Sequence, residues 1–473
     1  MKPGSVLSFF LILFPGLALT VQAGEDPWLE KTFALGATGA MPQGILSRSE
    51  LQNLTGIGEQ LFTAKFTTLD GAGRPGATQA IIPTRPRHRP AQAFTRTSGP
   101  DSNACSSCHN DPVAGGAGDF VTTVFVSEGF ANANFDTTDP QFSNERGTNH
   151  LFGAGLVEML AREMSEDLAR LRAQALEQAA GSGNPVRIDL TTKGVSFGRL
   201  TAMPDGLVDL KELDGIDTDL VVRPFSQKGV MTSLRQFTVN AMNHHHGMQA
   251  DERYGRRWTG TDDFDDDGMH LELSDADVSA LVAWQATLPP PIRKIPDDGR
   301  WKKAADKGAR LMDEFGCTAC HIQSLPLKSL AFADPGPFDV SGTLNDRQVD
   351  KPAIYDLALM QWAAQLPRND KGQVLVPLFG DLKRHKMTDR SIELLGNELL
   401  SQRFVDRDIF LTSELWGVGS TAPYGHRNDF TTLDEIILAH AGEARDARDR
   451  YRKADDAARS NLIAFLRTLV IDP

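Results

Sequence analysis

The chain has 473 residues, of which 40% are apolar, and its 49 basic and 62 acidic side chains give a formal net charge of −13. This length allows two or three domains. The acidic balance argues against nucleic acid and against an anionic membrane surface as partners.

Residues 1–23 are typical of a secretory signal peptide. Lys2 precedes an apolar run from Val6 to Leu19, and Val21-Gln22-Ala23 resembles a cleavage site. The run is too short for a spanning helix, although an uncleaved anchor is the alternative, and no later segment approaches roughly 18 apolar residues. We therefore expect a mature chain without an integral membrane span, exported across the cytoplasmic membrane.

The first predicted helix follows Ser47-Arg48-Ser49-Glu50, which has the pattern of a capping box. Its apolar residues recur at helical spacing and predict about four turns. They are Leu51, Leu54, Ile57, Leu61 and Phe62.

The motif C-x-x-C-H occurs at 105–109 and again at 317–321, and the two copies use all 4 cysteines. This spacing is the attachment site of a c-type haem, in which two thiols bind the porphyrin vinyl groups and the histidine faces the iron. A structural zinc site requires no histidine in the fifth place, and a redox disulfide would be a single pair near a βαβ unit. We expect two covalent c-type haems, which are attached outside the bacterial cytoplasm and so favour a periplasmic location. The attachment residues are Cys105, Cys108 and His109 in the first copy, and Cys317, Cys320 and His321 in the second.

Between the two motifs, residues 151–180 predict a long amphipathic helix and residues 185–230 predict short strands or extended turns. A helix at 232–243 then leads into His244-His245-His246. The triplet and His150 are the histidines within reach of the far side of a haem held at His109, where one of them could bind the iron. A histidine triplet at a helix end is also commonly a solvated cluster.

Asp263, Asp265 and Asp267, followed by Gly268, match the opening of a calcium-binding loop. The twelfth position is Ser274 rather than glutamate, so the loop is not a complete EF-hand. These aspartates are a candidate calcium site, and an acidic solvated turn is the alternative.

Each half has the plan of a small cytochrome c domain, in which one helix leads into the haem motif and a last helix crosses it. The last helices are a capped segment from Ser274 to Leu288, stopped by three prolines, and residues 455–470; residues 301–315 lead into the second motif. We therefore predict an all-α fold of two tandem cytochrome c-like domains at 24–290 and 301–473, with long loop insertions in the first and a linker at 291–300. Two unrelated haem domains are the alternative.

The far ligand of each iron decides between electron transfer and chemistry. Met387, in a polar loop-like stretch, is the first candidate for the second haem, although it could simply be a packing residue. His385 is its nearest rival.

Several blocks of the second half resemble the bacterial di-haem cytochrome c peroxidase superfamily, and most closely its di-haem oxidoreductase branch. They are Phe379-Gly380-Asp381 through Met387, Leu415-Trp416-Gly417-Val418-Gly419-Ser420-Thr421-Ala422-Pro423-Tyr424-Gly425-His426, and Ile437-Leu438-Ala439-His440-Ala441-Gly442-Glu443-Ala444. The resemblance implies that the second haem takes electrons from a donor and that the first reduces peroxide. It also implies a calcium ion near the domain junction, which no residue match ties to the acidic loop.

One departure from the family concerns the position between Tyr424 and His426. Many of these peroxidases have methionine there as the second haem's far ligand, and this chain has Gly425. The resemblance therefore leaves Met387 as the natural replacement, with Tyr424 and His426 still open.

Peroxide cleavage requires a group that takes a proton from one oxygen and gives it to the other. Glu158 follows a segment resembling the peroxidases' active-site helix and is the candidate, with His150 as the second choice. An ordinary carboxylate on a helix surface is the alternative for Glu158. Trp258 and Trp416 are hypothesised to bridge the two haems, and packing in the core is the alternative for each.

The expected function is reduction of hydrogen peroxide with electrons from a small cytochrome c or a cupredoxin. An oxidase or oxygenase acting on another substrate is a second expectation. An electron-transfer cytochrome with both irons six-coordinate is a third.

Overall fold

The structure is a computed structural model that describes residues 28–32, 39–73, 102–125, 143–264, 267–340 and 342–472. The predicted signal peptide lies outside these residues, and so does Asp265. Across the described ranges, no helix is both long and apolar enough to cross a membrane.

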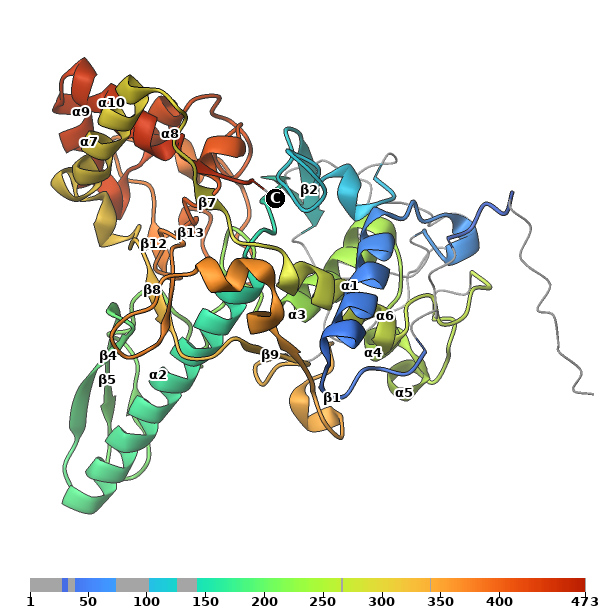
Figure 1. The fold of residues 1–473 in the computed structure, drawn as a ribbon. Helices are drawn as coiled ribbons and strands as arrows, with labels where there is room; N and C mark the ends of the chain where they lie inside the picture. Colours follow the sequence, from blue (N-terminus) through green and yellow to red (C-terminus); the bar gives the residue numbers. More distant parts are fainter. Residues whose placement is uncertain are drawn as a thin grey trace, which may run out of the picture.

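Helices dominate both halves of the chain (Figure 1). They are α1 (Arg48–Thr63), α2 (Ala154–Ser182), α3 (Leu234–Ala241), α4 (Asp251–Tyr254), α5 (Arg256–Thr259), α6 (Asp275–Thr287), α7 (Gly299–Phe315), α8 (Leu433–Ala439), α9 (Arg445–Lys453) and α10 (Asp456–Leu466). Both predicted capping boxes form, at Ser47 with Glu50 and at Ser274 with Asp277.

Short strands accompany the helices, so the expectation of an all-α fold is too narrow. They are β1 (Gly44–Ile45), β2 (Val121–Phe125), β3 (Ser143–Gly147), β4 (Val186–Thr192), β5 (Val195–Ala202), β6 (Val208–Asp209), β7 (Ile292–Arg293), β8 (Leu325–Leu327), β9 (Ala331–Asp334), β10 (Ala353–Asp356), β11 (Val374–Val376), β12 (Arg384–Lys386), β13 (Ile409–Leu411) and β14 (Leu469–Val470). Most have two to four residues, which is too short for an alternating pattern to stand out. The longest pair, β4 and β5, fulfils the expectation of strands within 185–230.

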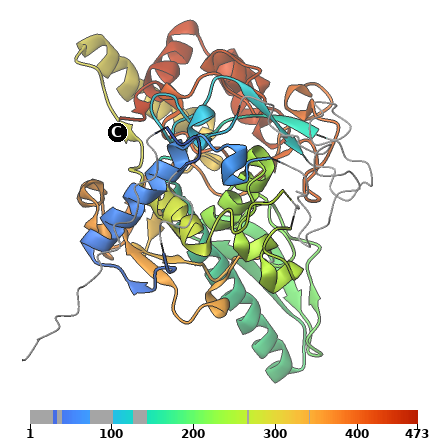
Figure 2. The same cartoon turned by 90° about the vertical axis from the view of Figure 1, so that its right-hand side faces the viewer.

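The same helix crossing occurs once in each half. α1 packs on α6, and α7 packs on α10, which Figure 2 shows at two separate places in the molecule. A Cβ atom at Gly58 would lie 2.0 Å from the Ala280 carbonyl oxygen, and one at Gly308 would lie 2.0 Å from the Asn461 carbonyl oxygen. Each crossing therefore requires glycine, because no side chain fits between the two backbones.

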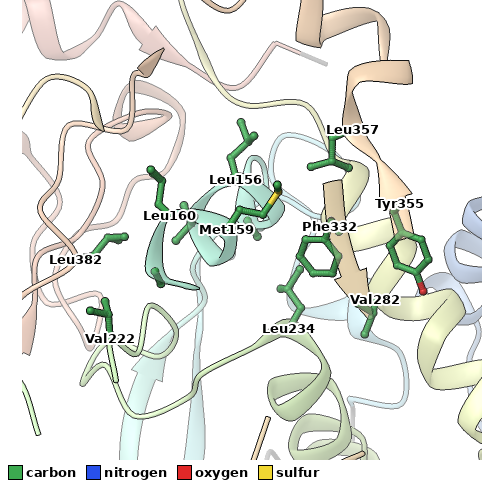
Figure 3. Close-up of a cluster of buried hydrophobic side chains, with 14 of the residues drawn as sticks. Leu156, Met159, Leu160, Val222, Leu234, Val282, Phe332, Tyr355, Leu357 and Leu382 are labelled. Atoms are coloured by element: carbon green, nitrogen blue, oxygen red, sulfur yellow. The ribbon is translucent and has the colours of Figure 1, made fainter. Parts of the chain in front are cut away.

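Two cores organise the chain. The larger core combines α1, α2 and α6 with second-half residues from β8 to β11, including Phe332, Tyr355 and Leu357 (Figure 3). The smaller core joins α7 to α10. β1 near the start of the chain pairs in parallel with β10, and β10 pairs with β9. A segment that follows the second haem motif thus completes the core of the first half.

One arm extends from the body. The C-terminal half of α2 and the hairpin of β4 and β5 run side by side away from the rest of the chain (Figure 1). Neither haem motif lies in this arm, because both motifs are outside α2, β4 and β5.

Candidate haem sites

The first C-x-x-C-H motif forms a tight 3₁₀ turn over Cys105–Ser107. The His109 backbone N–H donates to the Cys105 carbonyl at 3.0 Å, so the chain turns back and places the histidine beside the two thiols. The His109 side chain bonds through Nδ1 to the Gly116 carbonyl oxygen at 3.2 Å. This carbonyl can only accept, so Nδ1 carries the proton and the Nε2 lone pair is available to a metal.

The second motif repeats this geometry. A 3₁₀ turn spans Cys317–Ala319, and the His321 N–H donates to the Cys317 carbonyl at 2.9 Å. His321 Nδ1 donates to the Phe379 carbonyl oxygen at 3.2 Å. Phe379 belongs to one of the blocks that carry the family resemblance. The structure shows a role for this block, because its Phe379 carbonyl orients the His321 ring.

Both histidines are neutral at physiological pH. Burial lowers the pKa of His109 to about 4, against the opposing hydrogen bonds to Gly116 and Asn149. Burial and then the charge of His440 lower the pKa of His321 to about 4. A neutral imidazole with a fixed tautomer is the form that binds iron.

Aromatic side chains from the crossing helices pack near each histidine. The Phe62 ring on α1 lies 6.0 Å from the His109 ring and 4.2 Å from Trp284 on α6. In the second half, Phe379 lies 5.8 Å from Phe465 on α10. The helix crossings therefore position both attachment segments.

The histidine triplet lies beside the first motif. α3 continues into one turn of π-helix over Met242–His246, an irregularity that is frequent at functional sites. His246 Nε2 lies 3.5 Å from the Cys105 sulfur, and its ring lies 5.9 Å from Phe66. Both His244 and His246 are buried. The structure thus brings the triplet to the thiol edge of the first motif.

Glu158 lies elsewhere. It is fully buried on α2, accepts the Leu234 N–H at 2.7 Å and forms an ion pair with Arg162. Burial raises the pKa of Glu158, and the positive charge of Arg162 opposes the rise. Leu234 begins α3 and His246 follows twelve residues later, which corresponds to about 18 Å of helix. Glu158 and the triplet therefore lie at opposite ends of this helical segment.

His150 lies on the His109 side of the first site. The neighbouring Leu151 N–H donates to Gly115, and Gly115 donates to the His109 carbonyl. The His150 ring itself donates from Nε2 to the Trp416 carbonyl oxygen at 3.1 Å. The structure therefore brings His150 together with the second half of the chain. Trp258, the other tryptophan considered as a bridge, is 46% exposed on α5.

Met387 immediately follows β12 and is half-buried. Its backbone N–H donates to the Asp408 carbonyl at 2.8 Å, and its side chain packs against a cluster that includes Leu395, Phe410 and Ala439. Ala439 precedes His440, a charge neighbour of His321. Met387 is thus linked to His321 indirectly, through Ala439 and His440, and its role as a ligand stays a prediction.

His385 is held on both ring nitrogens. Nδ1 lies 2.7 Å from Glu443, and Nε2 lies 2.9 Å from Asp381. Burial would lower the pKa of His385, but the hydrogen bonds and charges of Asp381 and Cys320 raise it to about 11. Carboxylates therefore occupy both ring nitrogens of His385 in this structure. Among the described residues, one group of side chains could hold a metal ion, with its ligand atoms within 4.8 Å of one another. It consists of Cys320, Asp381 and His385.

Tyr424 and His426, the other candidates for the far ligand of the second haem, each contact other groups. The Tyr424 hydroxyl donates to the Val418 carbonyl at 3.2 Å. The His426 ring lies 4.5 Å from the Phe410 ring at a tilt of 36°, and His426 Nε2 lies 3.4 Å from Glu398. Burial, followed by the nearby charge of Arg146, lowers the pKa of His426 to about 2.

Sequence reasoning did not propose His440 as a site residue. Its Nδ1 donates to the Ile436 carbonyl at 2.7 Å, the same tautomer that His109 and His321 adopt, and burial lowers its pKa. The signal was present, since His440 stands in one of the blocks that carry the resemblance.

The acidic loop is only partly described. The Asp263 carboxylate accepts the backbone N–H groups of Asp267 and Gly268, both at 3.1 Å. These bonds close a turn, and the calcium site stays a prediction.

The family model described as "Di-haem oxidoreductase, putative peroxidase" matches residues 368–469. No curated protein matches the sequence.

Several solved structures match the chain, among them a hydrazine synthase and a MauG-like protein. A hydrazine synthase chain from Kuenenia stuttgartiensis aligns at 11% identity with a TM-score of 0.37, covering 99% of this chain and 100% of that chain. A MauG-like protein associated with microbial copper homeostasis aligns at 14% identity with a TM-score of 0.28, covering 57% of this chain and 78% of that chain. TM-scores this low do not establish a common fold. Residues 368–469 do match the di-haem oxidoreductase family, as the resemblance of the sequence implied.

Proposed function

We propose that the chain is a periplasmic di-haem c-type oxidoreductase that reduces hydrogen peroxide. The observation that carries the proposal is the repeated geometry of the two motifs. In each, the histidine backbone closes a turn on the first cysteine, and Nδ1 donates to a backbone carbonyl at 3.2 Å. Unrelated roles for the two motifs would not require the same tautomer twice.

The residues fit a covalent haem at each motif. Two thiols and one neutral imidazole with a free Nε2 are the donor set that c-type attachment uses. His109 and His321 would hold the irons, and Met387 is the proposed far ligand of the second. When bound, haem supplies one-electron chemistry and a site for a small oxidant.

The first motif is the proposed reaction site, and the histidine triplet is the proposed proton-handling group there. His246 borders the Cys105 thiol, whereas Glu158 is paired with Arg162 at the far end of α3. A buried imidazole can take a proton from one peroxide oxygen and return it to the other. This assignment replaces Glu158 and His150 as the acid–base candidates.

Electrons are proposed to enter at the second motif from a small cytochrome c or a cupredoxin. The net charge of −13 suits a donor with a basic contact surface. The signal-like residues 1–23 support export, which covalent haem attachment in bacteria also requires.

The test starts with the mature, haem-loaded chain. We expect two haems per chain by the pyridine haemochrome assay, and turnover of hydrogen peroxide with a reduced small cytochrome. Cyanide should bind one iron and perturb its spectrum. Fewer than two haems would contradict the proposal. Two low-spin irons that ignore cyanide in every redox state would instead indicate an electron-transfer protein.

His246→Gln tests the proton-handling role. We expect a fall in peroxide turnover of about 10²-fold or more, because general acid–base groups commonly contribute that much, while haem content stays at two. The exposed His270→Gln is the matched control. Full activity of the His246→Gln variant would remove the triplet from the reaction site.

A further inference from the structure

The two halves meet through a repeated five-residue pattern, leucine–aromatic–glycine–x–glycine. The first copy is Leu151-Phe152-Gly153-Ala154-Gly155, and the second is Leu415-Trp416-Gly417-Val418-Gly419. Gly153 and Gly417 share nearly the same left-handed backbone, with φ of 83° and 84°. The repeat therefore extends to conformation as well as sequence.

Each copy contacts the other half at its central glycine. A Cβ atom at Gly153 would lie 2.6 Å from the Trp416 indole, and one at Gly417 would lie 2.9 Å from His150 Nε2. Trp416 is 3% exposed, so the contact is buried on the second-half side. Both positions need glycine for the backbone conformation and for the space. The two copies therefore pack against each other at these two glycines.

Each copy is also bonded to the loop that holds the haem-motif histidine of its own half. In the first half, the Leu151 N–H donates to the Gly115 carbonyl at 2.7 Å, and the adjacent Gly116 carbonyl accepts His109 Nδ1. In the second half, the Leu415 N–H donates to the Phe379 carbonyl at 3.3 Å, and that same carbonyl accepts His321 Nδ1.

The His150 side chain connects the hydrogen bonds that lead from His109 to those that lead from His321. His150 Nε2 donates to the Trp416 carbonyl oxygen at 3.1 Å. Every other link is a covalent bond or one of the backbone and Nδ1 hydrogen bonds above. His109 and His321 are thereby connected without a through-space gap.

We propose that His150 is the residue that couples the two haem centres electronically, by closing this path between the two proximal histidines. The proposal rests on the proposed function for the presence of both haems. Electron tunnelling decays less steeply along covalent and hydrogen bonds than across van der Waals gaps, and the His150–Trp416 hydrogen bond is the one side-chain link in this path.

The step transfers one electron at a time. With haems bound at both motifs, one electron would pass from the ferrous iron held by His321 to the ferric iron held by His109, so that one iron would lose and the other gain a single electron. No bond forms or breaks, and His150 keeps its Nε2 proton throughout. The small redox protein proposed as the donor then restores the second haem.

The test compares three variants of the full, haem-loaded chain by pulse radiolysis, following electron equilibration between the haems in their visible bands. His150→Phe keeps a ring and removes the donor, whereas His150→Gln keeps an amide N–H that can reach the Trp416 carbonyl. His270→Phe is the control for the loss of an exposed histidine.

We expect His150→Phe to slow the intramolecular step relative to the wild type and to the control variant, with the spectrum and midpoint potential of each haem unchanged. His150→Gln should stay close to the wild-type rate. A wild-type rate in His150→Phe, or equal slowing in the Phe and Gln variants, would overturn the proposal, and so would a shifted potential that explains the rate. These measurements need no peroxide, so a chain that fails to turn over peroxide can still pass or fail them, whereas a chain with one haem fails the proposed function first.

Discussion

At the scale of single residues, the imidazole ring of His150 is neutral in the folded chain and carries one N–H proton. Burial, the largest cause, lowers its pKa to about 4, and the hydrogen bond to Trp416 opposes the shift. That bond fixes the proton on Nε2. In the unfolded chain the ring titrates near its ordinary value of about 6.5. The unfolded state therefore binds more protons between these two values.

This difference predicts a pH-dependent stability. As pH falls from about 6.5 to 4, the folded chain should lose up to about 3 kcal/mol of unfolding free energy through His150. His150→Gln has no such group, so its unfolding free energy should decline less over the same range. Denaturant unfolding of both haem-loaded proteins at pH 7 and pH 4.5 checks this. Parallel pH profiles for the two proteins would contradict a buried neutral His150.

At the scale of elements, most helices were predictable and most strands were not. Capping boxes and apolar spacing mark α1 and α6 because both signals are local in the sequence. β8 and β12 have three residues each and owe their pairing to distant partners. The motif histidines were likewise predictable, since C-x-x-C-H is a local pattern. The contact of His150 with Trp416 spans 266 residues, so no local pattern could indicate it.

The helix crossings give a prediction at this scale. Gly308→Ala places a Cβ atom against the Asn461 carbonyl and should cost about 1–3 kcal/mol of stability, because the two backbones must separate. Gly181→Ala is the matched control. It lies near the end of α2 with nothing within 4 Å of its Cβ position, so it should be neutral or stabilise the chain by up to about 1 kcal/mol. Urea unfolding of both variants measures the difference, and equal stabilities would refute the tight crossing of α7 and α10.

At the scale of the whole molecule, a buried charge network ties the two halves together. Arg235 on α3 is 1% exposed and bonds Glu252 at 2.5 Å and Asp334 on β9 at 3.1 Å. The Tyr355 hydroxyl donates to the same Asp334 at 2.7 Å. Glu252 of the first half and Asp334 of the second thus share one cation, Arg235.

Removing that cation should be costly. Arg235→Leu leaves two buried carboxylates without their partner and should destabilise the chain by about 3–5 kcal/mol. The exposed Arg187, which pairs with Glu212 at the surface, is the control, and Arg187→Leu should cost less than about 1 kcal/mol. Thermal unfolding of the two variants decides, and similar midpoints would mean that the network adds little.

The core of the first half is completed by Phe332, Tyr355 and Leu357, which are synthesised only after the second haem motif. A ribosome-bound or newly exported chain that ends near residue 300 therefore lacks part of the interior around which α2 and α6 close. Such a fragment should stay open and sensitive to proteases until the later strands arrive. The polypeptide would then fold as one cooperative unit, in which the first half is completed only when the second half is present.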